Sequence, residues 1–135
     1  MQDVFDFCGG FQSEPGKILY GGPMMGIAVP DANFPVMKTT NAIVAMNERD
    51  ALLPDPTPCI RCGKCANTCP LRLTPFAIGE AVTKKDAGQL ARLKVMLCME
   101  CGCCSFICPA HRPLVQQNKL GKAILKAATP PKGGK

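Results

Sequence analysis

Residues 59–70 read Cys59-Ile-Arg-Cys62-Gly-Lys-Cys65-Ala-Asn-Thr-Cys69-Pro70, and the same cysteine spacing occurs again in Cys98-Met-Glu-Cys101-Gly-Cys-Cys104-Ser-Phe-Ile-Cys108-Pro109. Glycine follows the second cysteine of each run, at a position where a tight loop often needs positive φ. Proline follows the fourth cysteine, where it fixes φ and turns the chain away. One thiol spacing that occurs twice on such loops indicates two metal-ligand runs.

This spacing is the ligand run of bacterial ferredoxins, whose thiolates hold 4Fe-4S clusters. In two-cluster ferredoxins the fourth cysteine of each run binds the cluster of the other run. The sequence therefore predicts two 4Fe-4S clusters and no catalytic residue. The predicted ligands are Cys59, Cys62, Cys65 and Cys108 for the first cluster, and Cys98, Cys101, Cys104 and Cys69 for the second.

Zinc and disulfides are the competing uses of these cysteines. Zinc prefers two separated Cys-x-x-Cys pairs around a tetrahedron, whereas each run here has four cysteines and a trailing proline. Disulfides need an oxidising compartment. The N-terminus has no basic region followed by an apolar stretch, so it is not a secretory signal. Iron-sulfur chemistry is favoured because the spacing occurs twice.

Three further residues could be mistaken for ligands. Cys103 occupies the position that Lys64 has in the first run, so its register predicts a spare thiol that does not bind iron. Cys8 lies in an aromatic stretch and is expected to be a small buried apolar residue. His111 is the only histidine, and since eight thiolates suffice for two clusters, we expect it to be exposed.

The charge pattern argues for a basic end rather than a basic protein. The formal net charge is +6, but each cluster with its four thiolates contributes about −2, which leaves roughly +2. No acidic residue follows Glu100, while six lysines and arginines do. That end should meet an acidic protein surface or anionic headgroups, if it meets anything. No apolar run is long enough to cross a bilayer, which favours the reducing cytoplasm.

The chain is expected to be an α+β protein with three parts. Residues 1–50 suggest a small β-rich segment, with strands at 17–20 and 41–46 and a turn at 21–23. Residues 51–112 form the ferredoxin domain, and residues 113–135 form a basic helix, to Ala128, and a disordered tail.

Helices are expected between the two cysteine runs and after the second. Thr74-Pro75 and Asp86 are predicted to begin two helices, the second with Leu90, Leu93 and Leu97 on one face. In the last helix, the predicted apolar stripe is Leu120, Ala123, Ile124 and Ala127, and a second stripe of Lys119, Lys122 and Lys126 is expected to face solvent.

The two cysteine loops differ in charge. Arg61 and Lys64 lie in the first run, where Glu100 and Cys103 lie in the second. Because reduction adds negative charge, we predict the higher potential for the cluster held by Cys59, Cys62 and Cys65.

Several segments outside the cysteine runs resemble one family. They are Gly21-Gly-Pro-Met-Met-Gly26, Pro35-Val36 with Lys38-Thr-Thr-Asn41, and Arg112-Pro-Leu-Val-Gln116. With the cysteine runs, they resemble the C-terminal part of the C subunit of the Rnf (Rsx) electron transport complex, an ion-translocating, membrane-bound ferredoxin:NAD oxidoreductase. The resemblance implies that residues 1–50 are the end of a β-grasp-like domain of the soluble-ligand-binding type.

The resemblance also implies a role and partners. The chain would relay single electrons at the cytoplasmic face of the membrane, bound to other iron-sulfur and membrane subunits of the Rnf complex, and would convert no substrate alone. FMN and NADH would bind only in an N-terminal region of the family's protein that precedes the matching segments. We therefore expect a fragment or a split gene product.

Two other functions are weighed against this one. A free soluble two-cluster ferredoxin would have no use for a β-rich segment with an unpaired edge. An iron-sulfur module bound to nucleic acid would need basic and aromatic residues interleaved along a groove. The chain has one Tyr and no Trp, so nucleic acid is not expected as a partner.

Overall fold

The computed structural model describes residues 1–129, which form two units. The first unit is Met1–Pro54 and the second begins at Asp55. Most of the tail that we predict to be disordered, residues 130–135, lies outside the described residues. The fold is α+β, as expected, with a small sheet in the first unit and helices in the second.

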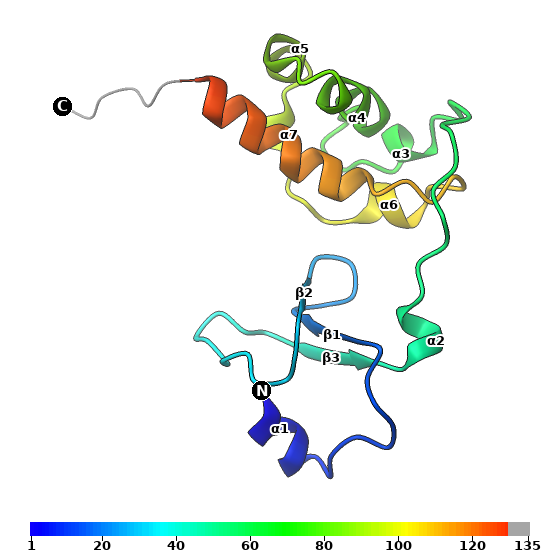
Figure 1. The fold of residues 1–135 in the computed structure, drawn as a ribbon. Coiled ribbons are helices and arrows are strands. Elements are labelled where there is room, and N and C mark those ends of the chain that lie inside the picture. Colours follow the sequence, from blue (N-terminus) through cyan, green and yellow to red (C-terminus); the bar gives the residue numbers. More distant parts are fainter. Residues whose placement is uncertain (130–135) are drawn as a thin grey trace, which may run out of the picture. The chain divides into compact units, whose positions relative to one another are not determined.

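The first unit consists of an antiparallel sheet and two short helices (Figure 1). Its elements are α1 (Gln2–Phe7), β1 (Lys17–Tyr20), β2 (Ile27–Val29), β3 (Ile43–Met46) and α2 (Glu48–Ala51). The strands follow the order β2-β1-β3, and both neighbours pair antiparallel with β1. β1 has the predicted bounds and β3 is shorter than predicted. β2 was not predicted, because three residues are too few to show an alternating pattern.

The loop between β1 and β2 explains the glycines of the segment that resembles the family. Gly21 has a φ of +98°, which favours glycine, and the Gly26 N–H donates to the Gly22 carbonyl at 2.7 Å. A Cβ atom on Gly26 would lie 2.5 Å from that carbonyl oxygen. The backbone therefore turns tightly here, as the sequence predicts.

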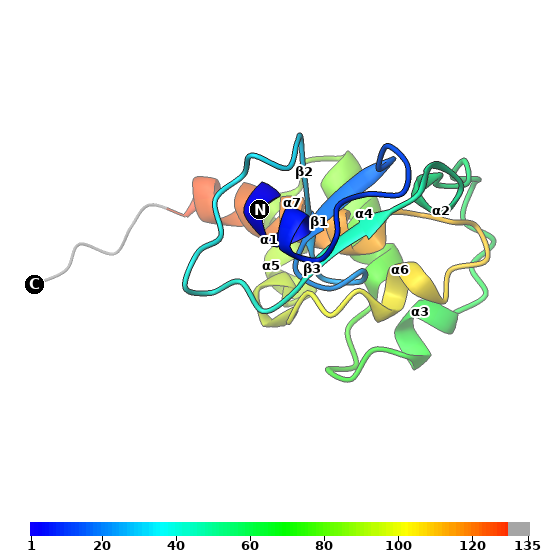
Figure 2. The same ribbon diagram turned by 90° about the horizontal axis from the view of Figure 1, so that it is seen from below.

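The second unit is helical. Its elements are α3 (Lys64–Asn67), α4 (Pro75–Thr83), α5 (Ala87–Arg92), the 3-10 helix η1 (Val95–Leu97), α6 (Cys103–Phe106) and α7 (Leu114–Ala128). The short helices α3 and α6 begin inside the two cysteine runs and lie side by side (Figures 1 and 2). α7 packs against α4, α5 and α6. Within the described chain, no helix combines the length and apolar character that a membrane crossing needs.

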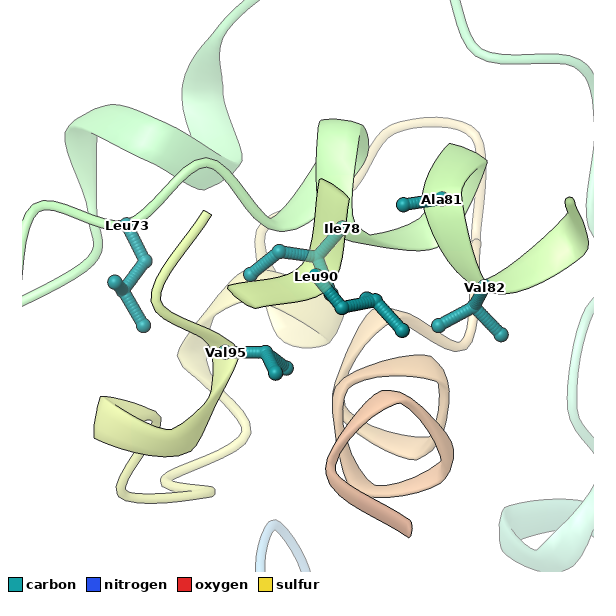
Figure 3. Close-up of a cluster of buried hydrophobic side chains, with 6 residues drawn as sticks. All are labelled: Leu73, Ile78, Ala81, Val82, Leu90 and Val95. Carbon is teal, nitrogen blue, oxygen red and sulfur yellow. The ribbon is translucent and has the colours of Figure 1, made fainter. Parts of the chain in front are cut away.

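A buried core holds α4, α5 and η1 against α7. Figure 3 shows its six buried side chains, which are Leu73, Ile78, Ala81, Val82, Leu90 and Val95. Ile124 and Leu125 of α7 pack against this cluster. This core lies beside the segments that carry the cysteines, since Cys69 and Cys98 also contact it.

The predicted helix starts are found in the structure. α4 begins with Pro75 after Thr74, although the Thr74 hydroxyl makes no capping bond. The Asp86 carboxylate accepts a hydrogen bond from the Gln89 N–H at 2.8 Å and caps α5. α5 ends at Arg92, because Lys94 has a φ of +53°. The predicted face is therefore wrong at its end, where Leu97 is 59% exposed.

The predicted apolar stripe of α7 is wrong at three of its four residues, and the fourth, Ile124, packs against the core. Leu120 is 54% exposed, and Ala123 and Ala127 are exposed too. The residues that α7 buries are Leu114, Val115, Asn118 and Gly121. Gly121 lets the helix approach closely, because a Cβ there would lie 3.0–3.2 Å from side-chain carbons of Val82, Leu90 and Val95. Hydrophobic periodicity does not find a stripe that contains asparagine and glycine.

Candidate metal centre

The four cysteines of the first predicted ligand set surround one cavity. Cys59, Cys62, Cys65 and Cys108 line it, and it has a volume of about 360 Å³ including its open mouth. Three of the thiols come from the first run, and Cys108 comes from the end of the second. The apolar side chains of Phe76 and Leu114 also line this cavity. The role of the four cysteines as ligands remains a prediction.

The second predicted set surrounds another cavity. Cys98, Cys101, Cys104 and Cys69 line it, and it has a volume of about 320 Å³ measured in the same way. Here too, three thiols come from one run and the fourth from the other. Each cavity therefore draws on both runs, as the interleaved assignment expects.

The loops that carry the thiols are structural repeats. Gly63 and Gly102 have φ values of +75° and +82°, and each precedes a short helix in its run. Arg61 and Glu100, the residues before the second cysteines, are also left-handed, with φ values of +54° and +61°. The left-handed conformation costs free energy for a non-glycine residue, and residues held in it cluster at functional sites. The sequence predicts the two glycines but not the two charged residues.

Burial changes the acidity of two thiols. Desolvation raises the pKa of Cys65, and it raises the pKa of Cys104 to about 11, with the neighbouring Cys98 thiol as the next cause. In the metal-free chain these thiols therefore keep their protons at neutral pH. A metal that binds them as thiolates must displace these protons.

One backbone amide and one side-chain amide donate hydrogen bonds to cysteine sulfurs at the second cavity. The Leu73 N–H donates to Cys69 Sγ at 3.4 Å, and Asn118 Nδ2 donates to Cys98 Sγ at 3.4 Å. Asn118 is only 1% exposed, and its Oδ1 has no hydrogen-bond partner among the described residues. Sequence reasoning missed Asn118, because a polar residue on an amphipathic helix gives no sign that it faces inward.

Arg112 is a half-buried cation at the first cavity. Its side chain lines the cavity, and its Nε atom is buried without a hydrogen-bond partner in the part of the chain that the structure describes. The sequence offers Arg112 only as part of the segment that resembles the family. A positive charge here would favour negative charge on any group that the cavity holds.

The lysine stripe of α7 does not face solvent throughout. Lys122 Nζ donates to Glu100 Oε1 at 2.7 Å, and its side chain is only 18% exposed. Lys119 also pairs with Glu100, at 3.9 Å. The expectation of a solvated stripe is therefore wrong at Lys122, which holds α7 to the second cysteine loop.

The expected charge difference between the two loops is weakened by ion pairs. Glu100 is paired with two lysines of α7, so the second loop is not locally negative. Arg61 pairs with Glu80 at 3.7 Å, although its side chain is 77% exposed. The ranking of the two cluster potentials stays a prediction. The structure removes one of its premises, the negative charge of the second cysteine loop.

The remaining candidate residues are placed as follows. Cys103 lines the second cavity together with the four predicted ligands. A side-chain hydrogen bond with Cys101, and then desolvation, raise the pKa of Cys103. Cys8 is exposed, so the expectation that it is buried is wrong, because α1 buries none of its residues. His111 is exposed, as expected.

The thiols do not converge on single points. Among residues 1–129, no group of three or more His, Cys, Asp and Glu side chains is arranged to hold one metal ion. The cysteines are instead distributed around the two cavities.

Comparison with known proteins identifies the family. A family model described as a 4Fe-4S dicluster domain matches residues 51–111. The chain is 41% identical over 125 residues to the C subunit of the ion-translocating oxidoreductase complex of Rhodobacter capsulatus, a match that covers 93% of this chain and 24% of the relative. This chain belongs to that C-subunit family. The resemblance stated from the sequence is thereby confirmed.

Other C subunits are also similar to this chain. The chain is 48% identical over 79 residues to the C subunit of the Na(+)-translocating ferredoxin:NAD(+) oxidoreductase complex of Acetobacterium woodii, a match that covers 58% of this chain and 18% of that protein. It is 38% identical over 125 residues to the corresponding protein of Methanosarcina acetivorans, with 90% and 27% covered. The chain spans about a fifth to a quarter of the length of the curated relatives that it matches.

Proposed function

We propose that this chain relays single electrons through two 4Fe-4S clusters within an Rnf-type ferredoxin:NAD oxidoreductase complex. The observation that carries the proposal is the pair of cavities, each lined by three thiols of one run and one thiol of the other. The names of the relatives support the wider setting, since one is part of a ferredoxin:NAD(+) oxidoreductase complex.

The proposed ligands are the eight cysteines of the two runs. Cys59, Cys62, Cys65 and Cys108 would hold the first cluster, and Cys98, Cys101, Cys104 and Cys69 the second. The donor set fits, because thiolates are the usual ligands of such clusters and each cavity offers four. Bound clusters would supply one-electron acceptance and donation.

The other residues around the cavities would control solvent and charge. Phe76 and Leu114 at the first cavity, and Leu73 and Val115 at the second, limit the access of water. Asn118 and the Leu73 N–H direct hydrogen-bond donors at cysteine sulfurs, and Arg112 brings a positive charge. Hydrogen bonds to sulfur, net charge and solvent exposure are the quantities that set cluster potentials.

The first unit holds none of the proposed ligands and would carry no electrons. We propose that residues 1–50 are the end of a β-grasp-like domain, supported by their three-stranded antiparallel sheet, with 51–112 as the ferredoxin domain and 113–135 as a basic end. Other subunits of the complex would be its partners, on the cytoplasmic side of the membrane. FMN and NADH would bind outside the segments that this chain provides.

The proposal is tested by anaerobic reconstitution with iron and sulfide. We expect about eight irons per chain and, after reduction, the electron paramagnetic resonance of two spin-coupled clusters. Cys62→Ser should lose or convert one cluster and leave the other. One tightly bound zinc per chain, with no uptake of iron and sulfide, would overturn the proposal.

A further inference from the structure

The second cavity has one thiol more than a 4Fe-4S cluster needs. Five cysteines line it, because Cys103 joins Cys69, Cys98, Cys101 and Cys104. Cys103 is the first residue of α6, and Cys104 is the second. The cavity brings Cys103 together with Cys101 of its own run and with Cys69 of the first run. Cys103 is therefore a member of the site rather than a distant surface thiol.

The first cavity has no such fifth thiol among the residues that the structure describes. Lys64 is the first residue of α3, as Cys103 is of α6, and Lys64 is exposed. The two loops share their left-handed glycine and the same short helix, so their backbones place these two residues equivalently. The second cavity therefore has a spare thiol and the first cavity has none. A cysteine substitution at the first cavity is thus a matched control for one at the second.

We propose that Cys103 is a reserve ligand of the second cluster that can take the place of Cys101. The proposal rests on the proposed function, because it assumes a cluster in this cavity. In the exchange, one iron–sulfur bond to Cys101 breaks and one to Cys103 forms. The Cys103 thiol loses its proton and the released Cys101 thiolate takes up one, so neither net charge nor oxidation state changes.

Cys101 is the ligand that we expect Cys103 to replace. The two residues are two positions apart and line the same cavity, whereas Cys104 is buried and packs in the core with Leu114 and Val115. A neighbouring thiol that enters the same cavity needs a side-chain rotation rather than a rearranged loop. The first site cannot compensate for the loss of Cys62 in this way.

The test compares Cys101→Ser with Cys62→Ser in the full chain after anaerobic reconstitution. We expect Cys101→Ser to keep about eight irons and two reduced clusters, and Cys62→Ser to lose or convert one cluster. Cys103→Ser should keep both clusters, and the Cys101→Ser/Cys103→Ser double variant should lose the second. If Cys101→Ser loses its cluster as Cys62→Ser does, or if Cys103→Ser loses one, the proposal is overturned.

A second measurement follows the thiol itself. In the loaded wild-type protein, alkylation followed by peptide mass spectrometry should label Cys8 and Cys103, the two cysteines outside the predicted ligand sets. In loaded Cys101→Ser, Cys103 should become protected while Cys8, which is exposed, still reacts. Labelling of Cys103 that stays unchanged in this variant would overturn the proposal. If the wild type binds no clusters at all, the proposed function has failed instead.

Discussion

Asn118 connects helix α7 to the second predicted cluster. It is almost fully buried, and its amide donates to Cys98 Sγ at 3.4 Å. A hydrogen bond to a ligand sulfur stabilises the more negative, reduced state of a cluster and so raises its potential. We expect Asn118→Leu to lower the potential of that cluster. A loss of about 1 kcal/mol between the oxidation states corresponds to about 40 mV for one electron.

The measurement for Asn118 is a redox titration followed by electron paramagnetic resonance. Gln116→Leu is the matched control, since Gln116 lies on an exposed position of the same helix. It should leave both potentials unchanged. An Asn118→Leu variant that keeps both wild-type potentials would show that this hydrogen bond has no effect on the cluster.

Arg61 tests the predicted order of the two potentials. The residue lines the first cavity, but its side chain is exposed and paired with Glu80. Arg61→Glu should lower the potential of the first cluster relative to the second, because a negative charge replaces a positive one. Solvent and salt screen an exposed charge, so the shift should be smaller than that of Asn118→Leu and should shrink at high salt. Two potentials that do not move would reject the ranking by charge.

At the scale of elements, the contact between α7 and the second cysteine loop depends on Lys122 and Glu100. The pair is partly buried and joins two segments that are far apart in the sequence. Lys122→Met should destabilise the loaded protein by about 1–2 kcal/mol, because Glu100 loses its closest charged donor. Thermal unfolding and the rate of cluster loss measure the effect.

The control for Lys122 is Lys126→Met. Lys126 lies one turn further along α7, is exposed, and makes no ion pair within residues 1–129. It should change the free energy of unfolding by no more than about 0.5 kcal/mol. Equal effects of the two substitutions would mean that the net charge of the helix, and not the pair, stabilises the loop.

The packing of α5 on α4 and α7 is tested at Leu90. This side chain is fully buried in the core of the second unit. Leu90→Ala removes buried methyl groups and leaves a cavity, which should cost about 2–5 kcal/mol in chemical denaturation. Leu120→Ala, on the exposed side of α7, should cost less than about 0.5 kcal/mol. Similar costs at the two sites would contradict the packing described for α7.

At the scale of the whole molecule, the iron-sulfur proposal concerns the second unit alone. All eight predicted ligands and both buried hydrophobic clusters lie after Pro54. A chain of residues 55–135 should therefore bind the same amount of iron and sulfide as the full chain, about eight irons. Iron analysis and the spectrum of the reduced protein measure this. A truncated chain that binds clearly less iron would show that the first unit takes part in cluster binding.

Features that depend on neighbouring residues could be predicted from the sequence. The left-handed glycines at 63 and 102, the start of α4 at Pro75 and the capping of α5 by Asp86 follow from local backbone and hydrogen-bond chemistry. The grouping of the eight cysteines into two sets is a prediction of another kind, because it applies the ligand pattern of two-cluster ferredoxins to a spacing that occurs twice.

Which faces of the helices are buried depends on tertiary packing and could not be predicted from the sequence. α7 buries Asn118 and Gly121 rather than its alanines, since the glycine allows close approach to Leu90 and Val95. The ion pair of Lys122 with Glu100 and the entry of Cys103 into the second cavity likewise join residues through the packing of α6 and α7. Such contacts depend on how separate elements meet in space, which the spacing of residues along one element does not encode.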